Sequence, residues 1–153
     1  MKKIFFISSL LIFLFTLSAC GKPVMMDALN KQGFYPYSND LLGFNLSLTK
    51  DFKYYQTQRT ELPTYTDLDI FVPTADANYA EQVPGYAEPI IVRVYDKSTY
   101  DALSASTTAG MIKVGENNNK VYNLIFWSKI PSDWQNKWSP AMKQQLISNF
   151  KLK

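Results

Sequence analysis

The chain has 153 residues, of which 46% are hydrophobic, 15% aromatic and 19% charged. This length fits one globular domain, and this composition excludes a disordered polyelectrolyte or a basic nucleic-acid-binding arm. The sequence contains no His and a single Cys, so it lacks the commonest general base and the commonest metal ligand. We therefore expect the sequence to indicate where the protein is located rather than which reaction it catalyses.

The first nineteen residues have the three parts of an export signal. Lys2 and Lys3 form a basic start, residues 4–17 form a hydrophobic run, and small residues follow that run. A helix of this length is about 21 Å long, whereas the hydrocarbon layer of a bilayer is about 30 Å thick. We therefore predict a cleaved signal peptide at residues 1–19 rather than a permanent transmembrane helix.

The only cysteine, Cys20, directly follows Leu17, Ser18 and Ala19. This quartet resembles the lipobox that bacterial lipoprotein signal peptidase recognises. The resemblance implies a diacylglycerol on the Cys20 sulfur, cleavage between Ala19 and Cys20, and frequent acylation of the new amino terminus. Two or three acyl chains hold a protein firmly on a membrane, whereas one holds it only marginally. The alternative is an ordinary signal peptide that happens to precede a small buried cysteine.

Removal of residues 1–19 takes away Lys2 and Lys3 and leaves 14 Lys and Arg against 13 Asp and Glu over 134 residues. The side-chain net charge of the mature chain is then only +1. We expect no nucleic-acid partner and no electrostatic docking on anionic lipid, because both need clustered basic residues. With Cys20 lipidated, no thiol remains to form a disulfide, so the hydrophobic core alone must stabilise the domain.

Residues 20–40 mix Pro, Gly and polar residues without a sustained period. We predict that they form a lipidated, flexible tether, with a helical turn at residues 24–29. The single globular domain is predicted to cover residues 41–153. Twenty extended residues span at most about 70 Å, so this tether would hold the domain clear of the membrane surface.

Hydrophobic alternation with period two predicts strands in the first half of the domain. They cover residues 44–49, 52–59, 65–72 and 90–95. In the third of these strands Leu68 and Ile70 would face the core, while Asp67 and Asp69 would share a solvated face. Several prolines between the third and fourth strands predict a long loop over residues 73–89.

The second half alternates helices with a hairpin. Ser98 and Asp101 have the spacing of a capping box, which predicts a short helix that ends near residue 105. Residues 111–127 predict a hairpin whose turn is rich in Gly and Asn.

Ser139 and Pro140 predict the start of a closing helix that ends near residue 149. Few consecutive strands have a helix between them. We therefore predict an α+β fold, with an antiparallel β-sheet packed against the C-terminal helix and one or two short helices.

Part of this pattern resembles the PsbP-like superfamily. Members often begin with a Tyr-x-x-x-x-x-Gly-Phe-x-Leu pattern and finish in a strand that contains Phe-Lys after a helix. In this chain Tyr37, Gly43, Phe44, Leu46 and Phe150 occupy those places. The resemblance covers residues 37–153. It implies an antiparallel sheet flanked by helices that serves as a binding or assembly module without shared catalytic residues.

Asp67 and Asp69 are the best candidates for chemistry, because their i, i+2 spacing on a strand places the carboxylates about 7 Å apart. This separation suits an inverting glycoside hydrolase, and two neighbouring acids also suit a hard cation such as Ca²⁺. The simpler interpretation is a solvated sheet face on which Arg93 pairs with one of the acids, an interaction worth about 0.2–1 kcal/mol. No phosphate loop, Cys or His metal set, or catalytic triad can be assembled, so we predict no catalytic residue, no metal and no cofactor.

Tyrosines in the predicted tether and long loop are candidates for partner binding, because they offer stiff contact area with a polar tip. They are Tyr35 and Tyr37 in the tether and Tyr79 and Tyr86 in the loop. A loop that only packs over a sheet edge would have the same composition.

Trp127, Trp134 and Trp138 would suit a platform for stacking sugars. Their positions in a strand and an amphipathic helix favour the core instead.

We predict a membrane-anchored bacterial envelope lipoprotein on the extracytoplasmic side of the cell membrane or the outer membrane. Its partners would be membrane lipid, through acylated Cys20, and another envelope protein, to which it binds as a non-catalytic assembly module. Two alternatives remain open. One is an extracytoplasmic hydrolase or Ca²⁺-binding protein that uses Asp67 and Asp69, and the other is a receptor for a sugar or peptide with an aromatic pocket.

Overall fold

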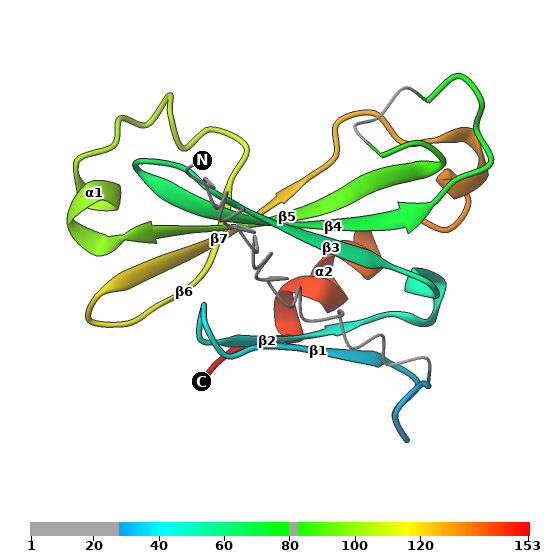
Figure 1. Cartoon of the computed structure of the whole chain (residues 1–153), viewed down its shortest axis with the longest axis horizontal. Helices are drawn as coiled ribbons and strands as arrows, with labels where there is room; N and C mark the ends of the chain where they lie inside the picture. Colours follow the sequence, from blue (N-terminus) through cyan, green and yellow to red (C-terminus); the bar gives the residue numbers. More distant parts are fainter. Residues whose placement is uncertain (1–27, 80–82) are drawn as a thin grey trace, which may run out of the picture.

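The computed structural model describes residues 28–79 and 83–153. The predicted signal peptide, the lipidation site at Cys20 and the helical turn predicted at residues 24–29 lie largely or wholly outside the described residues. The described part has an α+β fold that consists mostly of antiparallel strands (Figure 1). The predicted α+β class is therefore confirmed.

The strands of the described residues form two antiparallel sheets rather than the single sheet that we predicted. In chain order the strands are β1 (Tyr35–Asn39), β2 (Phe44–Leu48), β3 (Gln56–Glu61), β4 (Tyr65–Pro73), β5 (Tyr86–Asp96), β6 (Ile112–Glu116), β7 (Lys120–Phe126) and β8 (Phe150–Leu152). One sheet has the order β1-β2-β8 and the other has the order β3-β4-β5-β7-β6. The smaller sheet joins strands from both ends of the described chain.

The predicted tether is too long at its C-terminal end. Strand β1 lies within it and pairs with β2, with Tyr35 opposite Leu48 and Tyr37 opposite Leu46. Because residues directly opposite one another share a sheet face, the tyrosines join the hydrophobic face of β2. The folded domain therefore begins by Tyr35 and not at residue 41.

Four short helical segments complete the described fold. They are the 3-10 helices η1 (Lys50–Phe52) and η2 (Ser132–Trp134) and the α-helices α1 (Lys97–Asp101) and α2 (Pro140–Ser148). The start of α2 agrees with the prediction, since the Ser139 hydroxyl accepts a hydrogen bond of 3.2 Å from the Met142 amide.

The capping box predicted for the helix that follows β5 is wrong. Helix α1 begins at Lys97 after Asp96, which makes no side-chain cap, and it ends at Asp101, earlier than predicted. The Asp101 carboxylate pairs instead with Lys97 at 3.4 Å, one helical turn away. Lys97 also contacts Glu116 on β6, so this helix start is held by ion pairs on the surface.

Two strand boundaries differ from the sequence prediction for local reasons. Strand β3 begins at Gln56, four residues later than predicted, because residues 50–52 form η1. Strand β5 begins at Tyr86 and includes Pro89, which the sequence placed in a loop. Pro89 is tolerated because the β4–β5 register shifts there, with Val72 opposite Ala87 and Ile70 opposite Ile90.

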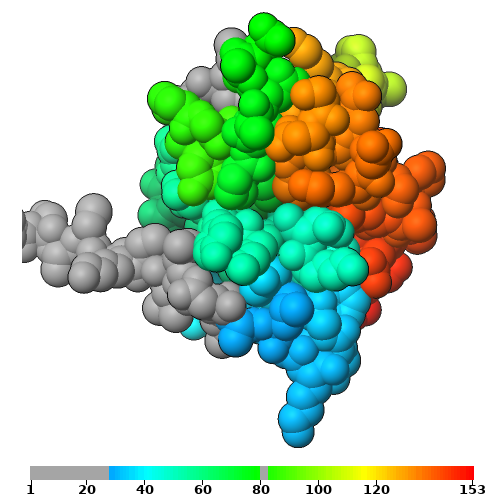
Figure 2. Space-filling model, turned by 90° about the vertical axis from the view of Figure 1, so that its right-hand side faces the viewer, coloured from blue at the N-terminus to red at the C-terminus, as the bar shows by residue number. Residues whose placement is uncertain are grey.

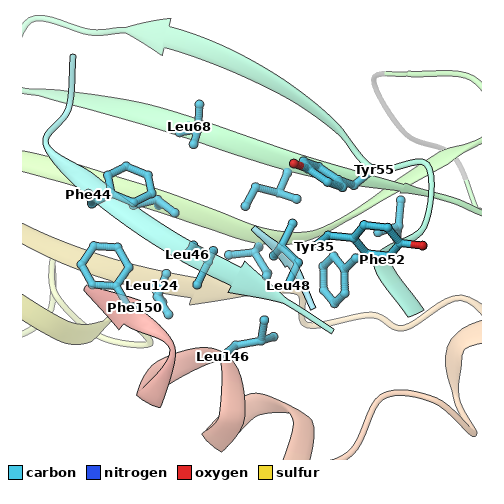
Figure 3. Close-up of a cluster of buried hydrophobic side chains, with 14 of the residues drawn as sticks. Tyr35, Phe44, Leu46, Leu48, Phe52, Tyr55, Leu68, Leu124, Leu146 and Phe150 are labelled. Carbon is cyan, nitrogen blue, oxygen red and sulfur yellow. The ribbon is translucent and has the colours of Figure 1, made fainter. Parts of the chain in front are cut away.

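The hydrophobic core lies between the two sheets and against α2 (Figure 3). Phe44 and Phe150 stack at 5.1 Å between ring centroids, and both point into this interior from the smaller sheet. Leu68 and Leu124 enter from the larger sheet, and Leu146 of α2 enters from the helix (Figure 3). The main core therefore occupies one face of the five-stranded sheet, and the other face carries the buried polar residues of β4 and β7 together with buried Phe71, Tyr95 and Val121.

Candidate functional site

Asp67 and Arg93 form a bidentate ion pair on the second face of the five-stranded sheet. They lie directly opposite one another on β4 and β5. The Arg93 Nε donates to Asp67 Oδ1 at 2.8 Å, and Arg93 Nη2 donates to Oδ2 at 2.7 Å. These hydrogen bonds raise the pKa of Arg93 above its ordinary value. Both carboxylate oxygens of Asp67 are thus engaged by one guanidinium.

The prediction that this face is solvated is wrong. Asp67 is 7% exposed and Asp69 is 8% exposed. Aromatic rings enclose the ion pair: the Arg93 guanidinium carbon lies 3.9 Å from the Tyr65 ring centroid, and Tyr65 contacts Tyr95 at 5.3 Å. The alternating pattern of β4 did not reveal that these acids are buried. Part of the enclosure comes from Tyr95 on β5, a strand that follows the long loop.

Helix α1 extends the aromatic cover over the same face. It packs on β5 and β7, and its Tyr100 ring lies edge-on to Tyr95 at 5.6 Å. The Lys113 ammonium of β6 lies 5.7 Å from the Tyr100 ring centroid. Helix α1 therefore partly covers the second face of the sheet, in keeping with the prediction that short helices pack on the sheet.

Asp69 has a different environment from Asp67. Burial first, and the neighbouring Asp67 second, raise the pKa of Asp69. Hydrogen bonds with Glu88 and Thr60 act in the opposite direction, as does the charge of Arg93. Glu88 is thus a neighbour of Asp69 that the sequence analysis did not identify.

Asp67 takes part in a contact that joins two strands of the sheet. Both oxygens of Asp67 accept hydrogen bonds from Arg93, and the adjacent positive charge makes this carboxylate a weaker base. Within residues 28–79 and 83–153, no group of three or more acidic, His or Cys side chains is arranged to hold a metal ion. The pairing of Arg93 with one of the two acids, which the sequence suggested, is the arrangement found at Asp67.

Asn123 is a buried polar residue on this face that the sequence analysis missed. It lies on β7, opposite Arg93 on β5 and Lys113 on β6. It is fully buried, and within the described part of the chain neither its Nδ2 nor its Oδ1 has a hydrogen-bond partner. Asn123 lies on the same face of β7 as Val121 and Ile125. This alternation, combined with the strand order, could have identified it as a buried residue.

The two tether tyrosines belong to the fold. Tyr35 is 5% exposed and lies in the core, so the expectation that it contacts a partner is wrong. Tyr37 is half-buried, with its ring 6.0 Å from that of Phe44, and its hydroxyl accepts a hydrogen bond from Asn39. Burial first, and the electrostatic effect of Tyr37 second, raise the pKa of Tyr55 to about 12.

The long loop is fastened to the segment around η2. Thr74 donates to Asp133 at 2.7 Å, and the Ser132 amide donates to Asp76 at 2.8 Å. The Tyr79 hydroxyl donates to the Lys129 carbonyl at 2.9 Å. Figure 2 shows the green loop lying against the orange segment on one face of the molecule.

The other loop tyrosine, Tyr86, is half-buried, and its hydroxyl accepts a hydrogen bond of 2.7 Å from Gln56 on β3. The hydroxyls of Tyr79 and Tyr86 are thus both engaged within the domain.

The three tryptophans pack on one another. Trp134 is 1% exposed and Trp138 is 7% exposed, and the Trp127 ring lies 5.6 Å from the first and 4.9 Å from the second. Trp134 Nε1 donates to the Pro73 carbonyl at 3.0 Å. This packing places the rings in the core, as the helical spacing favoured, and leaves no open aromatic platform at these residues.

In the described residues no helix is both long enough and apolar enough to cross a bilayer. The chain was also compared with protein-family models, with curated proteins and with solved structures, and none of these comparisons gives a match.

Proposed function

We propose that this protein is a lipid-anchored component of a bacterial envelope whose α+β domain binds or helps to assemble another envelope component without catalysing a reaction. The observation that carries the proposal is the quartet Leu17-Ser18-Ala19-Cys20 after a basic start and a hydrophobic run. The acylated form would lie on the extracytoplasmic side of the cell membrane or the outer membrane.

The position of β1 supports an anchored domain. Residues 21–34 separate Cys20 from the first strand residue, Tyr35. Fourteen residues can span at most about 50 Å, which is enough to place a small domain beyond the lipid headgroups. The anchor and the fold are therefore separate parts of the chain, and loss of one should not destroy the other.

The state of the acidic pair supports a non-catalytic role. Asp67 is held at both oxygens by Arg93, and Asp69 is hydrogen-bonded with Glu88 and Thr60. A hydrolase of the type considered above needs one carboxyl to donate a proton and the other to activate water or attack the substrate. A guanidinium bound at both oxygens of Asp67 disfavours either role.

We further propose that the domain is a PsbP-like module. Among the residues that carry the resemblance, Phe44, Leu46 and Phe150 lie together in the core, and Tyr37 packs on Phe44. Gly43 precedes them at a positive φ of 75°. These contacts support the proposal because the motif residues act together in one sheet rather than at scattered positions.

The test of the anchor is intact-mass analysis of the protein from the membrane fraction of expressing bacteria. We expect a chain that begins at Cys20 and carries the mass of a diacylglycerol, with or without a further acyl group. The Cys20→Ser variant should keep residues 1–19 and carry no lipid. An unmodified Cys20 thiol in a soluble product would refute the proposal.

The test of the binding role is crosslinking and capture from detergent-solubilised envelope, with the protein and its Asp67→Asn/Asp69→Asn variant compared side by side. A binding module should retain its crosslinked partner in the variant once folding is verified by circular dichroism. A hydrolase should show turnover on envelope glycans that the variant loses. Turnover of that kind would replace the binding role with the enzymatic alternative.

A further inference from the structure

We propose that the edge of β3 pairs with the same edge of a second copy of this chain, so that two larger sheets join into one continuous antiparallel sheet. This inference rests on the proposed function, because the lipid anchor would hold both copies at one membrane. Strand β3 is the end strand of the five-stranded sheet. An end strand offers backbone amide and carbonyl groups to which a further strand can bond.

The backbone of β3 has three residues whose polar groups point away from β4. The Leu62 amide donates to the Tyr65 carbonyl, and in an antiparallel pair the hydrogen-bonded residues alternate with residues that point outward. The register between β3 and β4 is continuous, so this alternation extends along the whole strand. No other strand of the described residues pairs with the outward-pointing groups. These groups are the amides and carbonyls of Thr57, Arg59 and Glu61.

The other edge strands of the described residues have features that hinder such pairing. Strand β1 contains Pro36, which has no amide hydrogen. Strand β6 has a register shift between Lys113 and Gly115. Strand β8 has only three residues and lies against β6, with Leu152 next to Gly115. Strand β3 has six residues, no proline and no register shift, so it is the edge that is most open to another strand.

The charges along β3 favour a second copy as the partner. Arg59 and Glu61 share one face of the strand, and their ion pair measures 3.0 Å between Nη2 and Oε1. Their side chains are 38% and 68% exposed, so both can reach a neighbouring strand. With a two-fold axis at Thr60, Arg59 of each copy lies opposite Glu61 of the other. Opposite charges then face each other on both sides of the axis, between residues that also exchange backbone hydrogen bonds.

The same charges disfavour the neighbouring registers. An axis at Arg59 places two guanidinium groups directly opposite one another, which is destabilising. An axis at Gln58 places Arg59 opposite Thr57 and leaves Glu61 outside the pairing. The charge pattern therefore selects the register with its axis at Thr60.

The size of this interface explains why the anchor matters. Two six-residue strands joined at their edges form a small contact for a stable dimer in solution. Confinement of both copies to one membrane raises their effective concentration, so a weak pairing can still be populated. The proposed acylation at Cys20 would supply that confinement.

The test is disulfide crosslinking of the full-length chain in membranes of expressing bacteria, with Thr60→Cys compared with Gln58→Cys. In the proposed register the two Thr60 positions form a non-hydrogen-bonded pair with Cα atoms about 4.5 Å apart, within reach of a disulfide. The two Gln58 positions lie about 13 Å apart along the strands, which is too far. Both variants keep Cys20, so any contribution from that thiol is the same in each.

After oxidation with copper phenanthroline, a non-reducing gel should show about tenfold more dimer for Thr60→Cys than for Gln58→Cys, because only the former meets the distance limit. Equal amounts of dimer would indicate random collision and overturn the proposal. A larger amount from Gln58→Cys, or a crosslink from Thr60→Cys to a chain of another mass, would overturn it as well.

Charge reversal in the Thr60→Cys background tests the register by a second route. Arg59→Glu leaves two acids on the edge and Glu61→Arg leaves two bases, so each change alone should remove most of the dimer. Coexpression of the two chains should restore the dimer as a mixed species, as should Arg59→Glu/Glu61→Arg in one chain. An ion pair confined within each chain predicts no recovery on mixing, so absence of the mixed dimer would overturn the proposal.

Failure of self-pairing can be told apart from failure of the proposed function, because intact-mass analysis of the same samples reports acylation at Cys20. If the chain is acylated and captures an envelope partner, while Thr60→Cys and Gln58→Cys give equal amounts of dimer, only the self-pairing is wrong. If the Thr60→Cys dimer predominates in a chain with an unmodified Cys20 thiol, only the anchor is wrong.

Discussion

Two acidic residues on the same strand face differ in what they contribute to stability. Asp67 meets Arg93 with two hydrogen bonds, and the exposed fractions of the two side chains are 10% and 18%. Asp69 lies two residues away, where burial and the charge of Asp67 raise its pKa. An Asp-to-Asn substitution removes the same charge at either position. A comparison of the two variants therefore measures the effect of the environment of each carboxylate.

Asp67→Asn should destabilise the domain by about 2 kcal/mol, because it leaves a largely buried guanidinium without its counter-charge. Asp69→Asn should be neutral or stabilising at pH 7, because it removes a carboxylate that burial and Asp67 disfavour. Urea unfolding of both variants measures the free energies of unfolding. Equal losses in the two variants would contradict this account.

The same pair predicts a pH dependence with a definite sign. A carboxyl whose folded pKa lies above its ordinary value of 3.8 stabilises the fold fully below that value and loses this contribution as pH rises through the folded pKa. Wild type should therefore lose stability relative to Asp69→Asn between pH 3.8 and neutral pH. Urea unfolding of both proteins across this range measures the difference, and a constant difference would show that Asp69 has an ordinary pKa.

At the scale of elements, the two α-helices differ in how they begin. Helix α2 has a serine cap, since Ser139 accepts a hydrogen bond from Met142, whereas α1 has no side-chain cap. Capping depends on the backbone conformation at the residue before the helix, and Ser98 lies inside α1 rather than before it. A matching sequence motif is therefore not sufficient for a cap.

Ser139→Ala should cost about 1 kcal/mol of stability, the usual value for loss of an N-cap side chain. Ser98→Ala is the matched control and should have almost no effect, because Ser98 caps nothing. Thermal unfolding followed by circular dichroism compares the two. A larger loss of stability in Ser98→Ala than in Ser139→Ala would support the predicted capping box and contradict the structure.

At the scale of the whole molecule, the ends of the domain meet in the smaller sheet. Strand β2 pairs with β1 on one side and with β8, the last strand, on the other. Lys153 donates its amide to the carbonyl of Gly43, which joins the C-terminus to the turn before β2. The sheet therefore needs residues that the sequence analysis placed partly in a tether.

A chain that starts at residue 29 should keep the melting temperature of the mature protein. A chain that starts at residue 40 loses β1 and the buried Tyr35, and should be less stable by at least 2 kcal/mol, about the value of one large buried side chain. Differential scanning calorimetry of the two shortened chains tests this. If the second were as stable as the first, β1 would belong to the tether after all.

The sequence by itself determined most of the local structure. Alternation identified β4, a turn rich in Gly and Asn identified the β6–β7 hairpin, and Ser139 with Pro140 identified the start of α2. These elements follow from residues that are neighbours in the chain, whose preferred dihedral angles and periodicity act locally. The lipobox is equally local, so the prediction of lipidation at Cys20 stands on the sequence alone and remains to be tested.

Only the tertiary structure decided which strands pair and which faces are buried. Tyr35 became a core residue because β8 and β2 supply the rest of its sheet, and Asp67 became buried because Arg93, Tyr65 and Tyr95 enclose it. The physical reason is that burial depends on contacts between residues far apart in the chain. A pattern of period two shows that a strand has two faces, but the elements that pack on each face determine which of them reaches water.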